Sequence, residues 1–227
     1  MRIVVTGGAG FLGDRLTRAL LARDVLTNAR GEPRQLKELV LIDVVPAKVA
    51  DPRVTFVTGD LADPAVMERA VTPDTESVFH FAATVSGQAE AEFDAVMRVN
   101  VDMTRALLER RRMLPRPPKV VFTSSIAVFG GPLLDPVPDD APATPRSSYS
   151  AQKAIGELLV YDMTRKGYIR RAITAIANRC RASGQAEQGR LVVRKQCHPR
   201  AAIWHRRALA RRAGHPRTGV VATRGGR

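Results

Sequence analysis

The sequence lacks a long apolar run, a metal-ligand pattern and a secretory leader. No apolar run among its 227 residues approaches the roughly 20 residues that a transmembrane helix needs. Arg2 is followed by only three apolar residues before the first glycines, unlike a signal peptide. The two cysteines, Cys180 and Cys197, do not have the spacing of a metal site. These absences predict a cytoplasmic protein with no membrane partner and no metal centre.

Acidic residues are almost missing from one part of the chain. Residues 170–227 contain fifteen Lys or Arg and one acidic residue, Glu187, so this segment carries the whole net charge of +14. Residues 1–169 have equal numbers of acidic and basic side chains. The change in composition predicts two parts: a folded domain over residues 1–169, and a disordered or poorly folded basic tail over residues 170–227.

The first residues combine a predicted strand, a glycine turn and a predicted helix. Residues 3–5 are an apolar run typical of a buried strand, and Leu16 and Leu20 recur at helical spacing. Between them stand Gly7, Gly10 and Gly13. Glycine allows a tight turn, close backbone approach to a pyrophosphate and close packing of helix on strand. The helix start also offers free N–H groups and a favourable dipole to phosphate. The segment therefore predicts a dinucleotide-binding turn.

A second predicted strand, residues 39–43, ends in an acid. A carboxylate at this point accepts hydrogen bonds from the adenosine ribose hydroxyls and repels a 2′-phosphate, so Asp43 favours NAD over NADP. Asp43 lies thirty residues beyond Gly13, whereas about twenty are expected. We therefore interpret residues 24–39 as an insertion. The alternative is that Asp43 merely ends a strand.

Three further apolar segments predict strands. Residues 54–57 run towards Asp60, residues 77–83 end in two alanines, and residues 119–125 end in serine. Asp60 either accepts from the adenine amino group or is a turn residue, and spacing does not separate the two. His80 lies inside an apolar strand, so we expect it to be buried and hydrogen-bonded rather than catalytic.

These five strands alternate with predicted helices and show no hairpin signals. The alternation predicts an α/β fold with a Rossmann-like, doubly wound parallel sheet. Ligands of such sheets bind beyond the carboxyl ends of the strands. The residues predicted at those ends are Gly7, Asp43, Asp60, Ala83 and Ser125.

A tyrosine and a lysine stand four residues apart in a predicted helix, residues 147–166, and so share one face. A free tyrosine has a pKa of about 10. The ammonium of Lys153 and an oxidised nicotinamide would favour the phenolate of Tyr149. Tyr149 would then take the proton of a secondary alcohol as its carbon gives hydride to NAD. Ser125 would bind the substrate oxygen, and Lys153 would also hold the nicotinamide ribose.

Several motifs together resemble the extended short-chain dehydrogenase/reductases, also called the NAD-dependent epimerase/dehydratase family. They are residues 6–13, 59–61, 82–83, 99–101, 123–130 and 149–153. The resemblance implies NAD as cofactor and Ser125, Tyr149 and Lys153 as catalytic residues, with Ser124 as the alternative to Ser125. It also implies that substrate contacts Ser86, Ser125 and Tyr149. The cofactor contacts it implies are Gly7, Gly10, Phe11, Leu12, Gly13, Asp43, Asp60, Leu61, Ala82, Ala83, Asn100, Tyr149 and Lys153.

Within the family, residues 39–48, 80–93 and 124–140 most resemble dehydrogenases that oxidise carbon 2 of a D-erythronate-like sugar acid. The alternatives are a nucleotide-sugar epimerase or dehydratase that keeps its NAD bound, and a non-catalytic NAD-binding fragment. The family's dimers form through the helices that contain Asn100 and Tyr149, so a homodimer is a further expectation.

The resemblance is expected to end near Ile169. Beyond it the family has a sixth strand and a carboxyl-terminal substrate domain, and neither is recognisable here, so we expect impaired activity. The basic tail is either an arm for nucleic acid or an acidic partner, or the product of a shifted reading frame in a GC-rich gene. We favour the second, because the break falls inside a domain and no nucleic-acid module accompanies the charge. No nucleic-acid partner is therefore expected.

Overall fold

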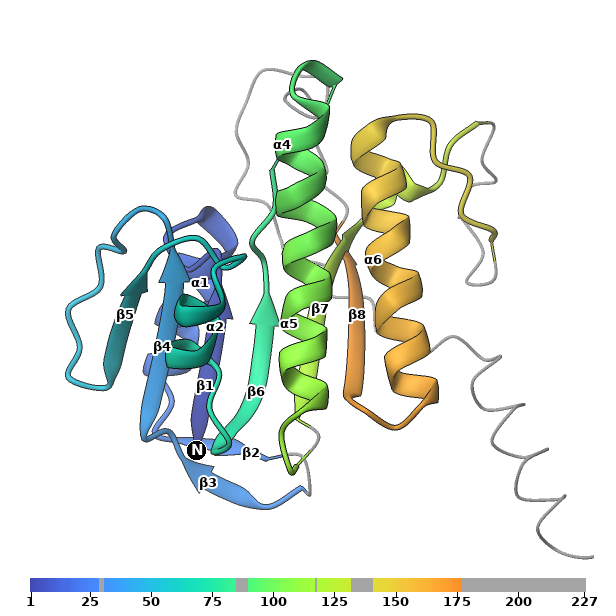
Figure 1. The fold of residues 1–227 in the computed structure, drawn as a ribbon. Coiled ribbons are helices and arrows are strands. Elements are labelled where there is room, and N and C mark those ends of the chain that lie inside the picture. The colour runs from blue at the N-terminus through green and yellow to red at the C-terminus, as the bar shows by residue number, and fades with distance from the viewer. Residues whose placement is uncertain (29–30, 85–89, 117, 132–140, 177–227) are drawn as a thin grey trace, which may run out of the picture. The chain divides into compact units, whose positions relative to one another are not determined.

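A computed structural model describes residues 1–28, 31–84, 90–116, 118–131 and 141–176. Its centre is a six-stranded sheet in which every neighbouring pair is parallel (Figure 1). In spatial order the strands are β5 (Val54–Thr58), β4 (Glu38–Asp43), β1 (Arg2–Thr6), β6 (Thr75–His80), β7 (Lys119–Ser125) and β8 (Arg170–Ile176). This is the doubly wound order, with its topological switch between β1 and β6. The predicted Rossmann-like fold is confirmed.

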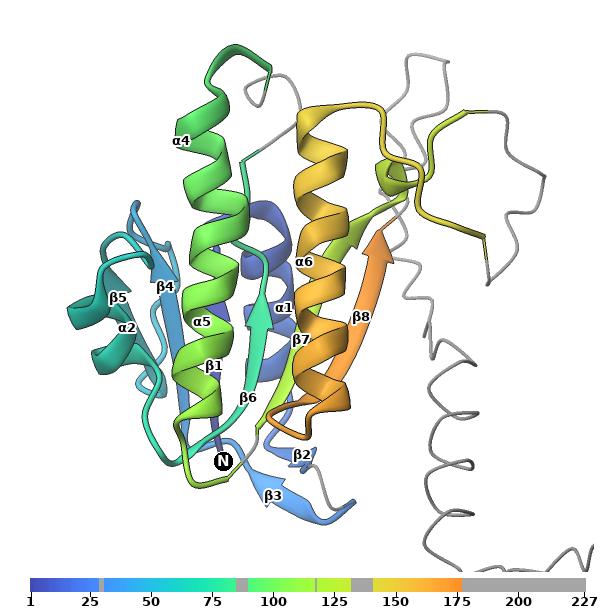
Figure 2. The same cartoon turned by 45° about the vertical axis from the view of Figure 1, so that its right-hand side comes forward.

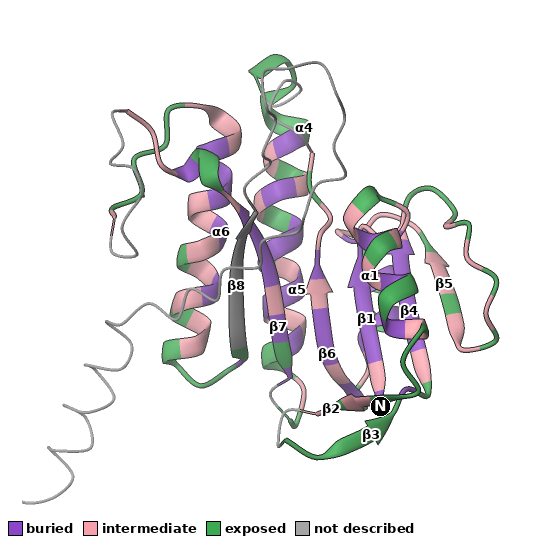
Figure 3. Ribbon diagram, turned by 180° about the vertical axis from the view of Figure 1, so that it is seen from behind, coloured by how far each residue is buried: buried purple, intermediate pink, exposed green. Residues whose placement is uncertain are grey.

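Helices cover the two faces of the sheet unequally among the described residues (Figures 1 and 3). Helix α1 (Phe11–Leu21) lies on one face. On the other lie α2 (Pro64–Ala70), α5 (Met103–Arg112) and α6 (Ser148–Arg165). Side chains alternate along each strand, so Ile3 and Val5 pack in the cluster with Leu20 of α1, whereas Val4 packs with Leu107 of α5. Both faces of β1 are therefore buried, as a central parallel strand requires.

The helix that leads into α5 contains a π-helical turn. A short helix α4 (Phe93–Met97) passes into the π-helix η1 (Arg98–Asp102) and then into α5, and together they form the long helix seen in Figure 2. π-Helical turns inside α-helices often occur at functional sites. Asn100 is buried in this turn.

Helix α6 begins with a capping box and packs closely on β7. The Ser147 side chain accepts from the Ser150 backbone N–H, and the Ser150 side chain accepts from that of Ser147. The absence of a side chain at Gly156 allows close packing, since a Cβ there would lie 2.5 Å from Cζ of Phe122. The capping box thus fixes where α6 begins, and Gly156 lets the middle of the helix lie close to β7.

The residues between α1 and β4, interpreted as an insertion, contain a hairpin that the sequence analysis did not predict. Strands β2 (Val25–Thr27) and β3 (Pro33–Gln35) pair antiparallel. Hydrogen bonds between Asn28 and Glu32 close the turn, the Asn28 side chain accepting from the Glu32 N–H at 3.0 Å. Leu26 is the one residue of these two strands that packs, half-buried, against the core, so they leave little pattern in the sequence.

The expectation that the sheet lacks its sixth strand is wrong. Arg170–Ile176 forms β8, which pairs with β7 along seven residues from Lys119 to Ser125. Its first two residues are arginines, so the apolar pattern that predicts a strand is missing there. The strand forms through backbone pairing with β7. Residues 177–227, the rest of the predicted basic tail, lie outside the described residues, and the shift of reading frame expected near Arg170 stays a prediction. Within the part described, no helix has both the length and the apolarity to span a membrane.

Candidate functional site

A cavity of about 470 Å³ opens beyond the carboxyl ends of β1, β4, β5 and β6. This is where the topological switch of a doubly wound sheet puts a ligand. The walls include most of the predicted cofactor contacts: Gly7, Gly10, Phe11, Leu12, Gly13, Asp43, Leu61, Ala82 and Ala83. Thr6, Ile42, Phe81, Thr84, Val99 and Met103 also line it and were not predicted. The strand-end argument, applied to each neighbouring residue, would have found the first four.

The glycines of the turn have three different steric roles. Gly7 has a positive φ of 69°, and a Cβ there would lie 2.8 Å from the Ala82 nitrogen. A Cβ on Gly13 would lie 2.1 Å from the Gly7 carbonyl oxygen, so this glycine lets α1 pack on the turn. At Gly10 a Cβ would meet only the Gly7 oxygen, at 3.3 Å. Gly10 therefore keeps open a space that belongs to the cavity.

Asp43 lies at the end of β4 and is tied to the glycine turn. Its Oδ2 accepts from the Ala9 backbone N–H at 3.0 Å, and its Oδ1 accepts from that of Val44 at 2.8 Å. The carboxylate is half-buried and lines the cavity. Its orientation is thus set by backbone donors, while its remaining acceptor capacity is available to a ligand hydroxyl. The thirty-residue separation from Gly13 is accommodated by the β2–β3 hairpin.

Asp60 is a turn residue in this structure. Its Oδ1 accepts from the Ala62 N–H at 2.8 Å, and its Oδ2 pairs with the Arg98 guanidinium at 2.6 Å. The residues that line the cavity include its neighbours Gly59 and Leu61 but not Asp60 itself. Of the two interpretations left open by the sequence, the local contacts favour the turn.

Asn100 is buried and reaches the cavity wall only through another residue. Its Oδ1 accepts from the Thr84 N–H at 2.9 Å, and its Nδ2 donates to Oε1 of Gln152 on α6 at 2.8 Å. Asn100 is not among the cavity-lining residues, whereas Thr84 is. Gln152 was missed by the sequence analysis, because a glutamine inside a helix carries no pattern that predicts burial.

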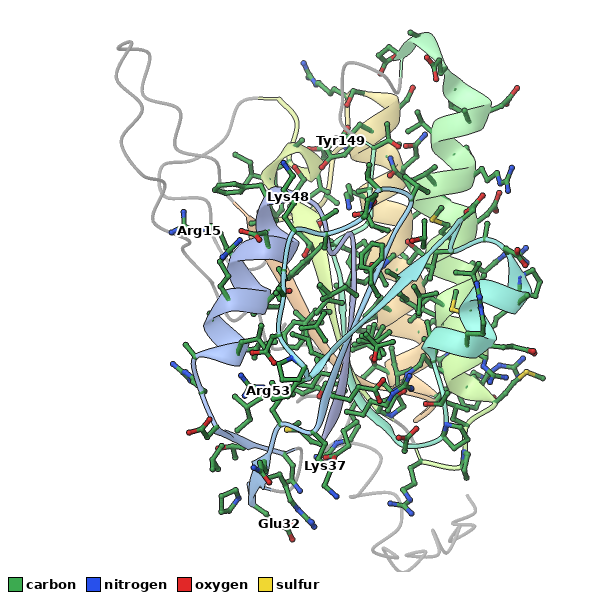
Figure 4. All side chains as sticks on the ribbon, turned by 90° about the vertical axis from the view of Figure 1, so that its left-hand side faces the viewer. Arg15, Glu32, Lys37, Lys48, Arg53 and Tyr149 are labelled. Atoms are coloured by element: carbon green, nitrogen blue, oxygen red, sulfur yellow. The ribbon has the colours of Figure 1, made fainter. Side chains whose placement is uncertain are left out.

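Lys153 is buried beneath the predicted catalytic tyrosine. Its Nζ donates to the Thr123 carbonyl oxygen at 3.0 Å and lies 5.9 Å from the centroid of the Tyr149 ring. Burial lowers the pKa of Lys153 to about 8. Tyr149 itself is half-buried, and Figure 4 shows it near the same end of the molecule as Lys48, with Glu32 and Lys37 at the opposite end.

The two serines that end β7 face different partners. Ser124 is buried and its hydroxyl donates to Glu157 on α6. Ser125 accepts from the Ala127 N–H at 3.2 Å, as the cap of the short 3₁₀-helix η2 (Ile126–Val128), so its own proton is left to donate. Glu157 was not predicted, and its position four residues after Lys153 was the only available signal.

His80 is buried, as expected, and both ring nitrogens have partners: Thr6 at 2.7 Å and Thr104 at 2.9 Å. Burial, and to a lesser extent the Lys153 charge, lower the pKa of His80 to about 3. Ser86, the predicted substrate contact, lies outside the described residues. Among the residues that are described, no cluster of three His, Cys, Asp or Glu side chains could hold a metal ion.

A family model and several curated proteins are similar to this sequence. Residues 3–193 match the model of the NAD dependent epimerase/dehydratase family, so the match continues past Ile169, where the resemblance was expected to end. D-erythronate dehydrogenase of Cupriavidus necator is 56% identical over 170 residues, which are 74% of this chain and 52% of that protein. The chain spans about half the length of the curated relatives it matches.

Two solved structures from Agrobacterium tumefaciens are also similar. The nucleoside-diphosphate-sugar epimerase superposes with a TM-score of 0.70 and 38% identity, over 83% of this chain and 56% of that chain. A short-chain dehydrogenase/reductase superfamily protein with bound NAD superposes with a TM-score of 0.63 and 30% identity, over 76% and 48% of the two chains.

Proposed function

We propose that this chain, which belongs to the NAD-dependent epimerase/dehydratase family, binds NAD and oxidises a secondary hydroxyl of a sugar acid. The observation that carries the proposal is that the glycine turn, Asp43 and the Ala82–Ala83 segment line the same cavity. The similarity of the chain to D-erythronate dehydrogenase supports a D-erythronate-like sugar acid as substrate. Oxidation at carbon 2 is the finer part of the proposal.

The residues around the cavity fit a dinucleotide. Gly10 leaves room against the start of α1, whose first N–H groups have no partner within the helix and suit a pyrophosphate. Asp43 would accept from the adenosine ribose. When bound, NAD supplies the acceptor for the substrate's hydride.

The chain's own residues would move the proton. Tyr149 takes the proton of the substrate hydroxyl, and Ser125 donates a hydrogen bond to the same oxygen. Lys153, held by the Thr123 carbonyl, favours the phenolate of Tyr149 through its charge and holds the nicotinamide ribose. We assign the substrate contact to Ser125 rather than Ser124, because the Ser124 hydroxyl is committed to Glu157.

Thermal melting of the purified chain tests cofactor binding, because a ligand that binds only the folded state raises the Tm. We expect NAD to raise the Tm and NADP to have little effect. NADH formation from D-erythronate, followed by absorbance, tests the reaction, and Tyr149→Phe should abolish it while the NAD-induced rise in Tm persists. A Tm that does not respond to NAD would contradict the proposal.

A second candidate is a nucleotide-sugar epimerase or dehydratase, favoured by the superposition on the Agrobacterium epimerase. It would use the same Ser125, Tyr149 and Lys153 but would keep its NAD bound and release no net NADH. A third, a non-catalytic NAD-binding fragment, would respond to NAD and form no product with either class of substrate.

Low turnover remains a prediction. The ground that the sheet lacks its sixth strand no longer holds, because β8 is present. A cytoplasmic location, the absence of a nucleic-acid partner, and a homodimer through the helices that contain Asn100 (η1) and Tyr149 (α6) also remain proposals. Sedimentation of the purified chain tests the last.

A further inference from the structure

A chain of buried hydrogen bonds crosses the sheet behind one wall of the cavity. Its centre is His80 at the end of β6, only 2% exposed. Nδ1 of His80 lies 2.7 Å from the hydroxyl of Thr6 on β1, and Nε2 lies 2.9 Å from the hydroxyl of Thr104 on α5. The imidazole therefore links two strands and a helix.

The neighbouring contacts determine which ring nitrogen carries the proton. The Thr104 hydroxyl donates its only proton to the Asn100 carbonyl oxygen at 2.8 Å, so it must accept from Nε2 of His80. In the neutral ring Nδ1 is then an acceptor, and the Thr6 hydroxyl donates to it. The Thr6 oxygen in turn accepts from the Ala82 backbone N–H at 3.2 Å. Each group in the chain has one consistent role.

This series of hydrogen bonds ends at residues that line the cavity. Thr6 and Ala82 both line it: Thr6 is the last residue of β1, and Ala82 lies two residues beyond the end of the adjacent strand β6. Next to them Gly7 approaches so closely that a Cβ would lie 2.8 Å from the Ala82 nitrogen. The hydrogen bond between Thr6 and Ala82 therefore helps to set the spacing between the glycine turn and the opposite wall.

We propose that His80, held as the Nε2–H tautomer, is a positioning residue for the cofactor: through Thr6 it fixes the Ala82 backbone on the cavity wall. The inference rests on the proposed function, because it takes this cavity to be the NAD site. A protonated ring would point an N–H at the Thr6 oxygen and deprive the Thr6 hydroxyl of its acceptor. Burial and the charge of Lys153 oppose that state.

The tautomer is measured directly by ¹⁵N NMR of the imidazole nitrogens in the full chain, with the His80 signals assigned from a His80→Gln variant. We expect a protonated Nε2 and an unprotonated Nδ1 that do not titrate between about pH 6 and 8. An Nδ1–H tautomer, or a ring that titrates in this range, would overturn the inference. The tautomer itself is measured on the wild-type chain, and the His80→Gln variant serves only to assign the signals.

A matched pair of variants tests the link to the cofactor. Thr104 does not line the cavity, Thr104→Val removes its hydroxyl at nearly constant volume, and Thr104→Ser keeps the hydroxyl. We expect Thr104→Val to weaken NAD binding by about five- to tenfold, as the loss of roughly one buried hydrogen bond implies, and Thr104→Ser to bind like the wild type.

The outcomes separate this inference from the proposed function. A wild-type chain that binds no NAD would overturn the proposed function and this inference with it. Wild-type binding of NAD together with an unchanged Kd in Thr104→Val would overturn this inference alone. If Thr104→Val does not fold, the wild-type ¹⁵N pattern still decides whether His80 has the required tautomer.

Discussion

Lys153 Nζ donates to the Thr123 carbonyl oxygen at 3.0 Å and lies 5.9 Å from the centroid of the Tyr149 ring. The cation is thus fixed by the end of β7 beneath the residue proposed as the base. Lys153→Met removes the charge but retains an apolar chain of similar length. We expect kcat for sugar-acid oxidation to fall at least about a hundredfold, the usual contribution of acid–base catalysis. We also expect the pH–activity profile to shift to higher pH. An unchanged pH profile would exclude this role of Lys153.

The burial of Lys153 predicts a pH dependence of stability. Its pKa falls from 10.5 to about 8 in the folded chain, so between these values the unfolded state binds more protons. Stability must therefore rise with pH in this window, by at most about 1.4 kcal/mol per pH unit. The free energy of unfolding of the wild type, measured by urea denaturation from pH 8 to 10.5, should rise relative to that of Lys153→Met.

Two glycines of the turn should separate stability from cofactor binding. Gly13→Ala places a methyl 2.1 Å from the Gly7 oxygen, so the backbone must shift. We expect a loss of about 1–3 kcal/mol in stability, as for other overpacked sites, together with a loss of NAD binding. Gly10→Ala meets only one atom, at 3.3 Å, so it should melt like the wild type yet bind NAD at least about tenfold more weakly. Calorimetry measures both quantities. Equal effects of the two variants on the Tm would contradict this division.

The serines that end β7 should also have separable effects. Ser125→Ala removes the proposed donor to the substrate oxygen, so kcat should fall by about a hundredfold, and the loss of its exposed cap on η2 should lower the Tm less than Ser124→Ala does. Ser124→Ala removes a buried partner of Glu157 and should lower stability by about 1–3 kcal/mol while residual activity stays closer to that of the wild type. The reverse pattern would assign the substrate contact to Ser124.

Asp43 should determine which dinucleotide is bound. Asp43→Asn keeps an acceptor for the Ala9 N–H but removes the charge that repels a 2′-phosphate. We expect the Kd for NAD to rise several-fold and the Kd for NADP to fall, so that the preference for NAD narrows by about tenfold. Fluorescence titration with each dinucleotide measures this ratio. A ratio equal to that of the wild type would show that Asp43 only ends its strand.

Periodicity in the sequence predicted the elements that bury apolar side chains. β4 begins one residue earlier than expected, and β7 has the expected bounds, Lys119–Ser125. The β2–β3 hairpin was missed because only one of its strand residues, Leu26, packs against the core. β8 was missed because the charge of Arg170 and Arg171 obscured a segment whose pairing is made by backbone groups.

The sequence by itself determined the fold class and most of the cavity wall, because glycine spacing and the ends of apolar runs are local properties of the chain. Only the tertiary structure decided that Asp60 pairs with Arg98, that Ser124 points to Glu157, and that His80 connects Thr6 to Thr104. These contacts join residues 24 to 74 positions apart. The packing of the helices on the sheet brings these partners together, and no local pattern in the sequence identifies residues that lie so far apart along the chain.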